Sequence, residues 1–206
     1  MQLVKCLLAD FQMRCERIIT ARSHMHCAEV FVSPIVHGMV AWLVAVLFAK
    51  QVNDRRLITI AGVVPDIDGI FILFDRAAYH ELHHTFGHSI LFGILVAIIA
   101  YALAKDRIKA FAGAIAAFSL HVISDVAVTN WSVAVLSPLS DYRLYLYQDP
   151  SLVAVVYPAI FFVCFGLILF TAYRRRISPL EFISEKWDRY VLGKLIPEKG
   201  GSIPPE

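Results

Sequence analysis

Five apolar segments, each close to the length of a membrane-crossing helix, constrain the fold of this chain more than any other feature. They are residues 30–49, 57–74, 89–104, 110–136 and 152–173. A helix needs about 20 mostly apolar residues to cross the hydrocarbon core of a bilayer. Hydrophobic residues make up 58% of the chain and charged residues 17%, against roughly 45–50% and 25% in typical soluble domains. The sequence therefore predicts an all-α, polytopic membrane bundle of about five apolar helices.

Short basic clusters orient this bundle. They follow the first, third and fifth segments, as Lys50, Arg55 and Arg56, then Lys105, Arg107 and Lys109, then Arg174, Arg175 and Arg176. Alternating spans place all three clusters on one side, which the positive-inside rule makes cytoplasmic. We therefore expect a multi-pass protein of the inner (plasma) membrane. The basic residues form no face or arm suited to nucleic acid, so no nucleic-acid partner is expected.

The segment order predicts three regions. Residues 1–29 mix basic and acidic residues and lack the apolar core and cleavage site of a signal peptide. We expect this segment to be either an amphipathic interfacial helix or a start that is not native. Residues 30–176 form the membrane-embedded domain, and residues 177–206 form an amphipathic cytoplasmic tail. The four cysteines show no CxxC spacing and predict neither a disulfide framework nor a zinc knuckle.

Four ionisable residues lie inside the second and fourth apolar segments: Asp66, Asp68, His121 and Asp125. A charged side chain at the centre of a bilayer costs about 2.5–3.5 kcal/mol on insertion scales. The two segments that carry these residues contain no lysine or arginine to compensate. A bound cation would compensate several of them at once, so the pattern favours a metal site.

The local spacing supports this interpretation and leaves alternatives open. His121 and Asp125 are four residues apart and project from one face of a helix, as two metal ligands or as a buried hydrogen-bonded pair. Asp66 and Asp68 follow Pro65, which interrupts the helix and lets both carboxylates turn inward. Alternatively, the two aspartates are solvated caps at a helix end.

Histidines complete the candidate site. His83, His84 and His88 gather in the loop before an apolar helix, and imidazole is the commonest metal ligand. His37 lies in the first apolar segment, where a lone histidine is more often a satisfied core residue than a ligand. At 1.5 Å per residue, all these groups fall in the outer half of the membrane or just above it. The predicted metal ligands are His37, Asp66, Asp68, His83, His88, His121 and Asp125.

These residues resemble the YdjM-type family of membrane-bound hydrolases, also described as LexA-binding and inner-membrane-associated. The resemblance runs from about residue 34 to residue 139 and includes the closing apolar segment. It is carried by the early His37, by a Pro-Asp-x-Asp motif at 65–68, by a His-Arg-x-x-x-His-Ser motif at 83–89, and by a His-x-x-x-Asp motif at 121–125. His84 departs from the family pattern, which usually has arginine there.

The resemblance implies a helical site similar to that of zinc-dependent phospholipase C, in which clustered His and Asp hold metal ions that attack phosphate esters. It implies a divalent metal, with Zn²⁺ suiting the mixed ligand set best and Mn²⁺ or Fe²⁺ as alternatives. Asp66 or Asp68 then bridges two ions or acts as general base, and a protonated His84 partly replaces the missing arginine. The expected substrate is a membrane lipid or a lipid-linked phosphoester.

Two other functions use the same residues. In a transporter, the cluster would bind a metal ion or relay protons. In a scaffold, the metal would be structural and the tail would bind a cytoplasmic protein partner. A closed four-ligand shell favours the scaffold, whereas an open coordination position favours catalysis. The placement of all the ligands toward one side of the membrane favours the enzyme.

Overall fold

The computed structural model describes residues 34–75, 79, 82–129, 131–147 and 149–196. The predicted N-terminal segment 1–29 and the end of the tail, residues 197–206, lie outside the described residues. Contacts divide the chain into two units, Met1–Ile35 and Val36–Glu206. Every regular element of the described residues is a helix, and the only β pairing among them is an isolated bridge between Val133 and Leu144.

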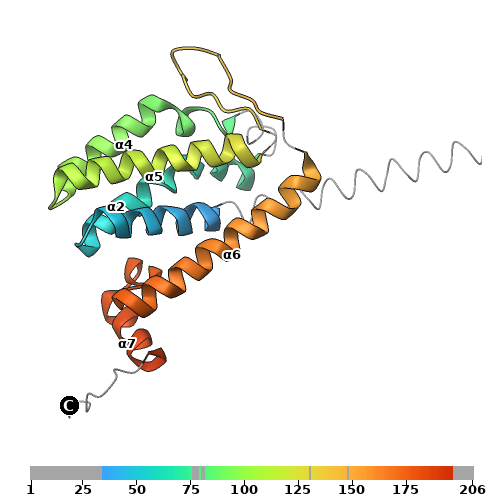
Figure 1. Cartoon of the computed structure of the whole chain (residues 1–206). Coiled ribbons are helices and arrows are strands. Elements are labelled where there is room, and N and C mark those ends of the chain that lie inside the picture. The colour runs from blue at the N-terminus through green and yellow to red at the C-terminus, as the bar shows by residue number, and fades with distance from the viewer. Residues whose placement is uncertain (1–33, 76–78, 80–81, 130, 148, 197–206) are drawn as a thin grey trace, which may run out of the picture. The chain divides into compact units, whose positions relative to one another are not determined.

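The helices follow three of the predicted apolar segments closely and differ from the other two. The order is Pro34–Phe48, α2 (Val52–Ala61), the 3₁₀ helices η1 (Val64–Leu73) and η2 (Phe86–His88), α4 (Ile90–Leu103), α5 (Arg107–Val128) and α6 (Pro150–Arg175), followed by η3 (Pro179–Phe182) and α7 (Glu185–Leu195) (Figure 1). Segment 57–74 is not one helix of spanning length, because α2 ends at Ala61 and the chain continues as η1. The fourth helix is also shorter than expected and ends at Val128.

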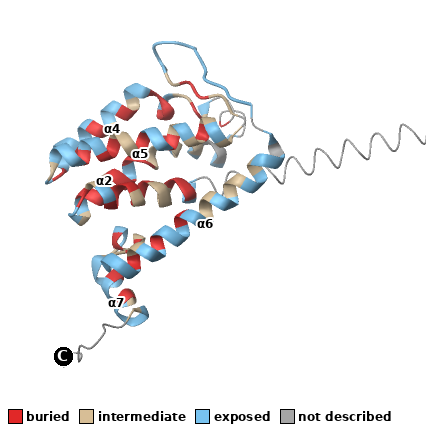
Figure 2. Ribbon diagram, viewed as in Figure 1, coloured by how far each residue is buried: buried red, intermediate tan, exposed pale blue. Residues whose placement is uncertain are grey.

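Two of these helices, Arg107–Val128 and Ser151–Arg175, are long and apolar enough to cross a membrane. Pro34–Phe48 and Ile90–Leu103 are apolar but shorter. The structure therefore supports a helical bundle with two candidate spans, and five full spans remain a prediction. Helix α6 exposes apolar side chains over most of its surface, apart from a buried stripe at Cys164, Ile168 and Ala172 (Figure 2). A helix that is apolar on every face suits lipid surroundings better than water.

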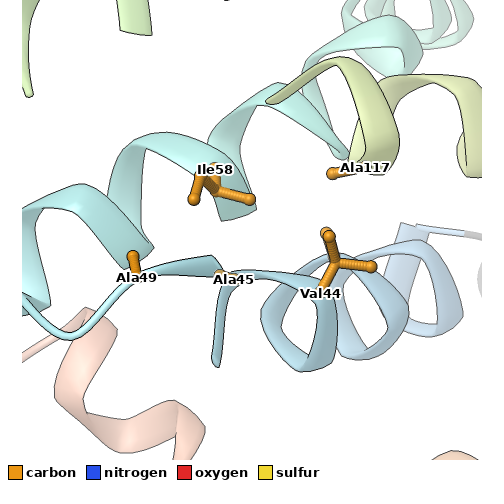
Figure 3. Packing of buried hydrophobic residues seen from close by; sticks show 6 residues of the cluster. Val44, Ala45, Ala49, Ile58 and Ala117 are labelled. Carbon is orange, nitrogen blue, oxygen red and sulfur yellow. The ribbon is translucent and has the colours of Figure 1, made fainter. Parts of the chain in front are cut away.

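Small residues hold the core of the bundle together. Ala45, Ala49 and Ala117 pack with Val44 and Ile58 where Pro34–Phe48, α2 and α5 meet (Figure 3). A second buried cluster, Ala61, Ala97, Ala100 and Ala114, joins α2, α4 and α5. Small side chains let helix backbones approach closely, which is the usual way that membrane helices associate.

The basic residues gather at one end of the bundle. Lys50 at the start of α2 and Lys105, Arg107 and Lys109 at the α4–α5 turn line one cleft. The buried carboxylate of Asp54 accepts hydrogen bonds from the backbone N–H groups of residues 105 and 106, at 2.9 and 3.0 Å, and so ties this turn to α2. The guanidinium of Arg175, at the end of α6, donates to the carbonyl of Val46 at 3.0 Å. The clusters expected on the cytoplasmic side thus lie close together.

A buried ion pair attaches the C-terminal segment to this same end. The guanidinium of Arg55 donates from Nε and Nη2 to the two carboxylate oxygens of Glu181 in η3, at 2.7 and 2.5 Å. Trp42 Nε1 donates to the same carboxylate at 3.1 Å. Both charged side chains are almost fully buried. The first part of the predicted tail is therefore packed against the membrane domain.

The close packing of Gly62 gives a prediction on stability. A Cβ added at Gly62 would lie 2.5 Å from the Cβ of Ala41 and 3.1 Å from that of Ala117, whereas one added at Gly166 in α6 meets nothing within 4 Å. We expect Gly62→Ala to destabilise the protein by about 1–3 kcal/mol, the usual cost of overpacking. Gly166→Ala should be neutral or slightly stabilising. Thermal unfolding of the detergent-purified variants measures this, and equal melting temperatures would contradict it.

The ion pair gives a second prediction. Glu181→Ala leaves Arg55 buried without its partner, which typically costs about 3–5 kcal/mol. We expect the C-terminal segment to detach and trypsin to cleave α7 at Lys186 and Arg189 faster. Glu185→Ala is the matched control, because it removes only an exposed pair with Arg189 at 3.8 Å, a kind that contributes about 0–1 kcal/mol. Equal digestion rates for the two variants would show that the pair does not hold the segment.

Candidate metal centre

The predicted ligands meet at the end of α5 that is farther from the basic cleft. Helix α5 begins beside that cleft at Arg107, and His121 and Asp125 lie on its last two turns. Their side chains share one face, and Nε2 of His121 is 3.1 Å from Oδ2 of Asp125. Both residues are almost fully buried. The i, i+4 spacing therefore places two candidate ligands side by side, as the sequence predicts.

The break between α2 and η1 orients His121. Because α2 ends at Ala61, the carbonyl of Gly62 is free to accept a hydrogen bond from Nδ1 of His121, at 2.8 Å. The other ring nitrogen, Nε2, then faces the cluster, 3.5 Å from Oδ1 of Asp66 in η1. A ligand histidine is commonly held in this way, with one nitrogen bonded to a carbonyl or carboxylate and the other turned to the metal.

His88 is held in the same way by Asp68. Its Nδ1 lies 3.3 Å from Oδ2 of Asp68, while its Nε2 lies 3.2 Å from Oδ2 of Asp125. The Nε2 atoms of His88 and His121 are only 3.3 Å apart. At most one proton fits between two facing ring nitrogens, so at least one of them presents a lone pair to the centre.

Asp68 contacts two histidines, His83 and His88. Oδ1 of Asp68 lies 2.7 Å from Nδ1 of His83, so the two oxygens of the carboxylate contact two different imidazoles. Both residues were predicted as metal ligands, and Asp68 also as a catalytic residue. Their contacts suit the orientation of neighbouring ligands, because carboxylates that hold a ligand histidine fix its tautomer and ring direction.

His84, predicted as a catalytic residue, lies inside the cluster. It has a left-handed backbone conformation with φ of 62°, which is uncommon for a non-glycine residue. Its carbonyl accepts a hydrogen bond from the N–H of Ala134, which anchors this conformation. Nε2 of His84 is 3.9 Å from Oδ2 of Asp125. Burial, together with the nearby charge of His88, lowers the pKa of His84 to about 3, so its ring is neutral near pH 7 and can act as a ligand.

His37 closes the cluster from the first helix. Its Nε2 is 3.0 Å from Oδ1 of Asp125, and its ring stacks on that of His121 with centroids 3.8 Å apart. The hydroxyl of Ser124 lies 3.3 Å from the other ring nitrogen. His37 thus belongs to the same group of side chains, and the alternative of an unrelated core histidine does not describe its surroundings.

Three buried polar atoms test whether a cation suits this cluster. Oδ2 of Asp66, Nδ1 of His84 and Oδ2 of Asp125 have no hydrogen-bond partner of good geometry among the described residues, although Nε2 of His88 and Nε2 of His121 lie 3.2 and 3.1 Å from Oδ2 of Asp125. Buried polar groups are normally satisfied, and an unsatisfied carboxylate oxygen is especially costly. A cation among these oxygens and ring nitrogens would satisfy the two carboxylates, so the donor set fits a metal ion.

The geometry separates two groups of three possible ligands. The first is His37, Asp66 and His121, and the second is His84, His88 and Asp125; within each group one ligand atom per residue lies within 4.8 Å of the others. Imidazole nitrogens with carboxylate oxygens suit Zn²⁺ and related divalent ions. Three protein ligands also leave a coordination position open, which is the arrangement of catalytic zinc sites.

Several residues that shape the centre were not predicted from the sequence. Trp131 packs edge-on against the rings of His83 and His84, with centroids 5.3 and 5.4 Å apart. Gly87 lets the loop approach η1, since a Cβ there would lie 2.5 Å from the carbonyl oxygen of Pro65. An isolated tryptophan and a glycine carry no spacing signal. The Pro65 break and the adjoining Gly62 are the features that the sequence did offer.

Comparison with known proteins gives one match. The model of a family described as YdjM inner membrane protein matches residues 32–191. That range contains every residue of the cluster. No curated protein and no solved structure matches the chain.

The double contact of Asp68 gives a prediction on metal binding. In Asp68→Asn, one imidazole loses the carboxylate that orients it, and we expect the affinity for Zn²⁺ to fall about 10–100-fold, as is typical for outer partners of metal ligands. Calorimetric titration of the metal-stripped protein measures this. Asp106→Asn is the control, because Asp106 is exposed and pairs with Lys109 away from the cluster. Equal affinities for the two variants would exclude a supporting role for Asp68.

Proposed function

Since the chain belongs to the YdjM family of inner membrane proteins, we propose that it is a membrane-bound, metal-dependent hydrolase that acts on a lipid-linked phosphoester. The observation that carries the proposal is the convergence of buried imidazole nitrogens with carboxylate oxygens. Among these atoms, Oδ2 of Asp66, Nδ1 of His84 and Oδ2 of Asp125 have no hydrogen-bond partner of good geometry among the described residues. A divalent ion bound there would supply Lewis-acid activation of water and of the phosphoryl group. Zn²⁺ is the proposed ion, on the chemistry of the donor set.

The side chains divide into three roles in this proposal. The groups His37, Asp66, His121 and His84, His88, Asp125 would each hold metal. Asp68 and His83 orient them. Oδ2 of Asp66 has no hydrogen-bond partner of good geometry among the described residues, which leaves this carboxylate oxygen available to accept a proton from the attacking water. The neutral ring of His84 carries a second nitrogen, Nδ1, that is also without a partner and can contact a substrate oxygen.

The described interior favours hydrolysis over transport. Between the cluster and the basic end, the core consists of small and aliphatic residues, among them Val44, Ala45, Ile58 and Ala114. A pathway for ions or protons is usually marked by polar or ionisable residues within the membrane. The polar residues of this region gather at the cluster and at the basic end, which suits chemistry at one side of the bilayer.

The number of ligands favours catalysis over a structural ion. A structural zinc site is typically closed by four protein ligands. Here His37, Asp66, His84, His88, His121 and Asp125 are all placed to donate, and His83 and Asp68 surround them. These six possible ligands exceed the four of a closed structural site. Their division into two groups is typical of sites in which two ions act together on a phosphoester.

Metal analysis combined with hydrolysis assays tests the proposal. We expect the purified protein to contain divalent metal and to release phosphate or a phosphorylated head group from phospholipids. A chelator should abolish this release, and added Zn²⁺ should restore it. Asp125→Asn should lose metal and turnover together, because Asp125 contacts His37, His88 and His121. Asp141→Asn, in an exposed loop, is the matched control and should retain both.

The alternatives predict different results in the same experiment. A protein that binds metal without hydrolysing any ester, and that carries the ion into sealed vesicles, would be a transporter. A protein that keeps its metal against chelators and shows neither hydrolysis nor uptake would be a scaffold. Absence of bound metal, together with no response of activity to Zn²⁺, would reject the proposal outright.

A further inference from the structure

An apolar groove lies beside the metal centre, between the first helix, α5 and α6. Val36 and Val40 line it from the first helix, Leu120 and Ile123 from α5, and Tyr157 and Ile160 from α6. Its volume is about 190 Å³. For scale, an apolar cavity of about 150 Å³ in a protein core accommodates a benzene molecule. The groove therefore has room for several carbons of a hydrocarbon chain.

The polar end of this groove is part of the centre itself. His37 and Ser124 line the groove, and they are 3.3 Å apart. The hydroxyl of Ser124 donates to the carbonyl of His121 at 2.7 Å, and Nε2 of His37 is 3.0 Å from Asp125. The imidazole of His37 thus separates the groove from the carboxylate of Asp125. A molecule in the groove would have its polar end within reach of the cluster.

The surroundings of the groove identify its occupant. Two of its three walls are α5 and α6, the helices long and apolar enough to cross a membrane. Ile123, on its rim, is 60% exposed, and the adjoining surface of α6 is apolar. In a bilayer, such a rim borders the acyl chains of lipids. Water would find few hydrogen-bonding partners along this lining, whereas a hydrocarbon chain matches it.

We infer that this groove binds the upper part of the hydrocarbon chain of a membrane lipid, whose phosphate-bearing head group then meets the metal centre past His37. The inference rests on the proposed function and specifies its substrate as a lipid that enters sideways from the bilayer. It follows that a water-soluble phosphoester without such a chain makes no use of the groove. The groove therefore determines which hydrocarbon chains the protein prefers in its lipid substrate, and the His/Asp cluster acts on the head group.

Photo-crosslinking tests the groove without requiring turnover. The full-length protein is reconstituted into phosphatidylcholine vesicles that contain a phosphatidylglycerol with a diazirine in the upper part of one acyl chain. Labelled peptides are then mapped by mass spectrometry. We expect label on the peptides that contain Val36, Ile123 and Ile160. Ile123→Trp and Leu120→Trp fill the groove and should reduce this label severalfold, whereas Ile99→Trp, on an exposed position of α4 outside the groove, should not.

The outcomes separate the groove from the hydrolase. Retention of metal by each variant shows that the centre is still folded. If label is spread over the outer faces of α4 and α6 and is equal in all variants, boundary lipid only is present and the inference is overturned. If label is specific to the groove but no lipid is hydrolysed, the groove stands and the hydrolase proposal fails. If lipids are hydrolysed, filling the groove should lower turnover of long-chain lipids severalfold more than turnover of p-nitrophenyl phosphate, whereas Ile99→Trp should leave both rates unchanged.

Discussion

The Nε2 atoms of His88 and His121 lie 3.3 Å apart beside the carboxylate of Asp125, and the rest of this structure depends on that contact. A carboxylate oxygen and the unprotonated nitrogen of a neutral imidazole both accept hydrogen bonds, and protons alone satisfy only part of such a cluster. Burial raises the free-energy cost of the groups left unsatisfied, because water cannot replace their missing partners. The arrangement is stable only in company with positive charge, whether as protons or as metal. For this reason the cluster points to a cation more strongly than any one of its residues does.

The remainder of the bundle holds this cluster rigidly at one end. Alanines at the crossings of the first helix, α2, α4 and α5 bring the backbones close together. The early end of α2 supplies a free carbonyl at Gly62, and the turn that follows presents Asp66 and Asp68. At the other end, the basic cleft and the Arg55–Glu181 pair collect the polar groups expected at the cytoplasmic surface. The fold thus separates two polar ends by an apolar interior, as a membrane requires.

Much of this organisation was predictable from the sequence because its signals are local. The spacing of His121 and Asp125 fixes a common helix face, and Pro65 marks the break that turns Asp66 toward the centre. The family resemblance is confirmed by the match over residues 32–191. Helix lengths were less predictable: segment 57–74 reads as one apolar run, although the chain leaves the α-helical conformation after Ala61. Two further features depend on the path of a loop, which no periodicity encodes. Trp131 contacts His83 and His84, and His84, not His83, is the histidine that lies near Asp125.

The free carbonyl of Gly62 also bears on how the protein is made. His37, Asp66, His88 and Asp125 come from four separate parts of the chain, and the ring of His121 is aimed by a backbone group almost sixty residues earlier. No fragment of the nascent chain that lacks α5 contains enough of these groups to coordinate an ion as the complete cluster does. If the cluster binds the proposed metal ion, its acquisition would therefore be a late event in biogenesis, after the helices have been inserted and have associated. Correct helix association becomes a precondition for loading, so a misassembled bundle would stay without its ion.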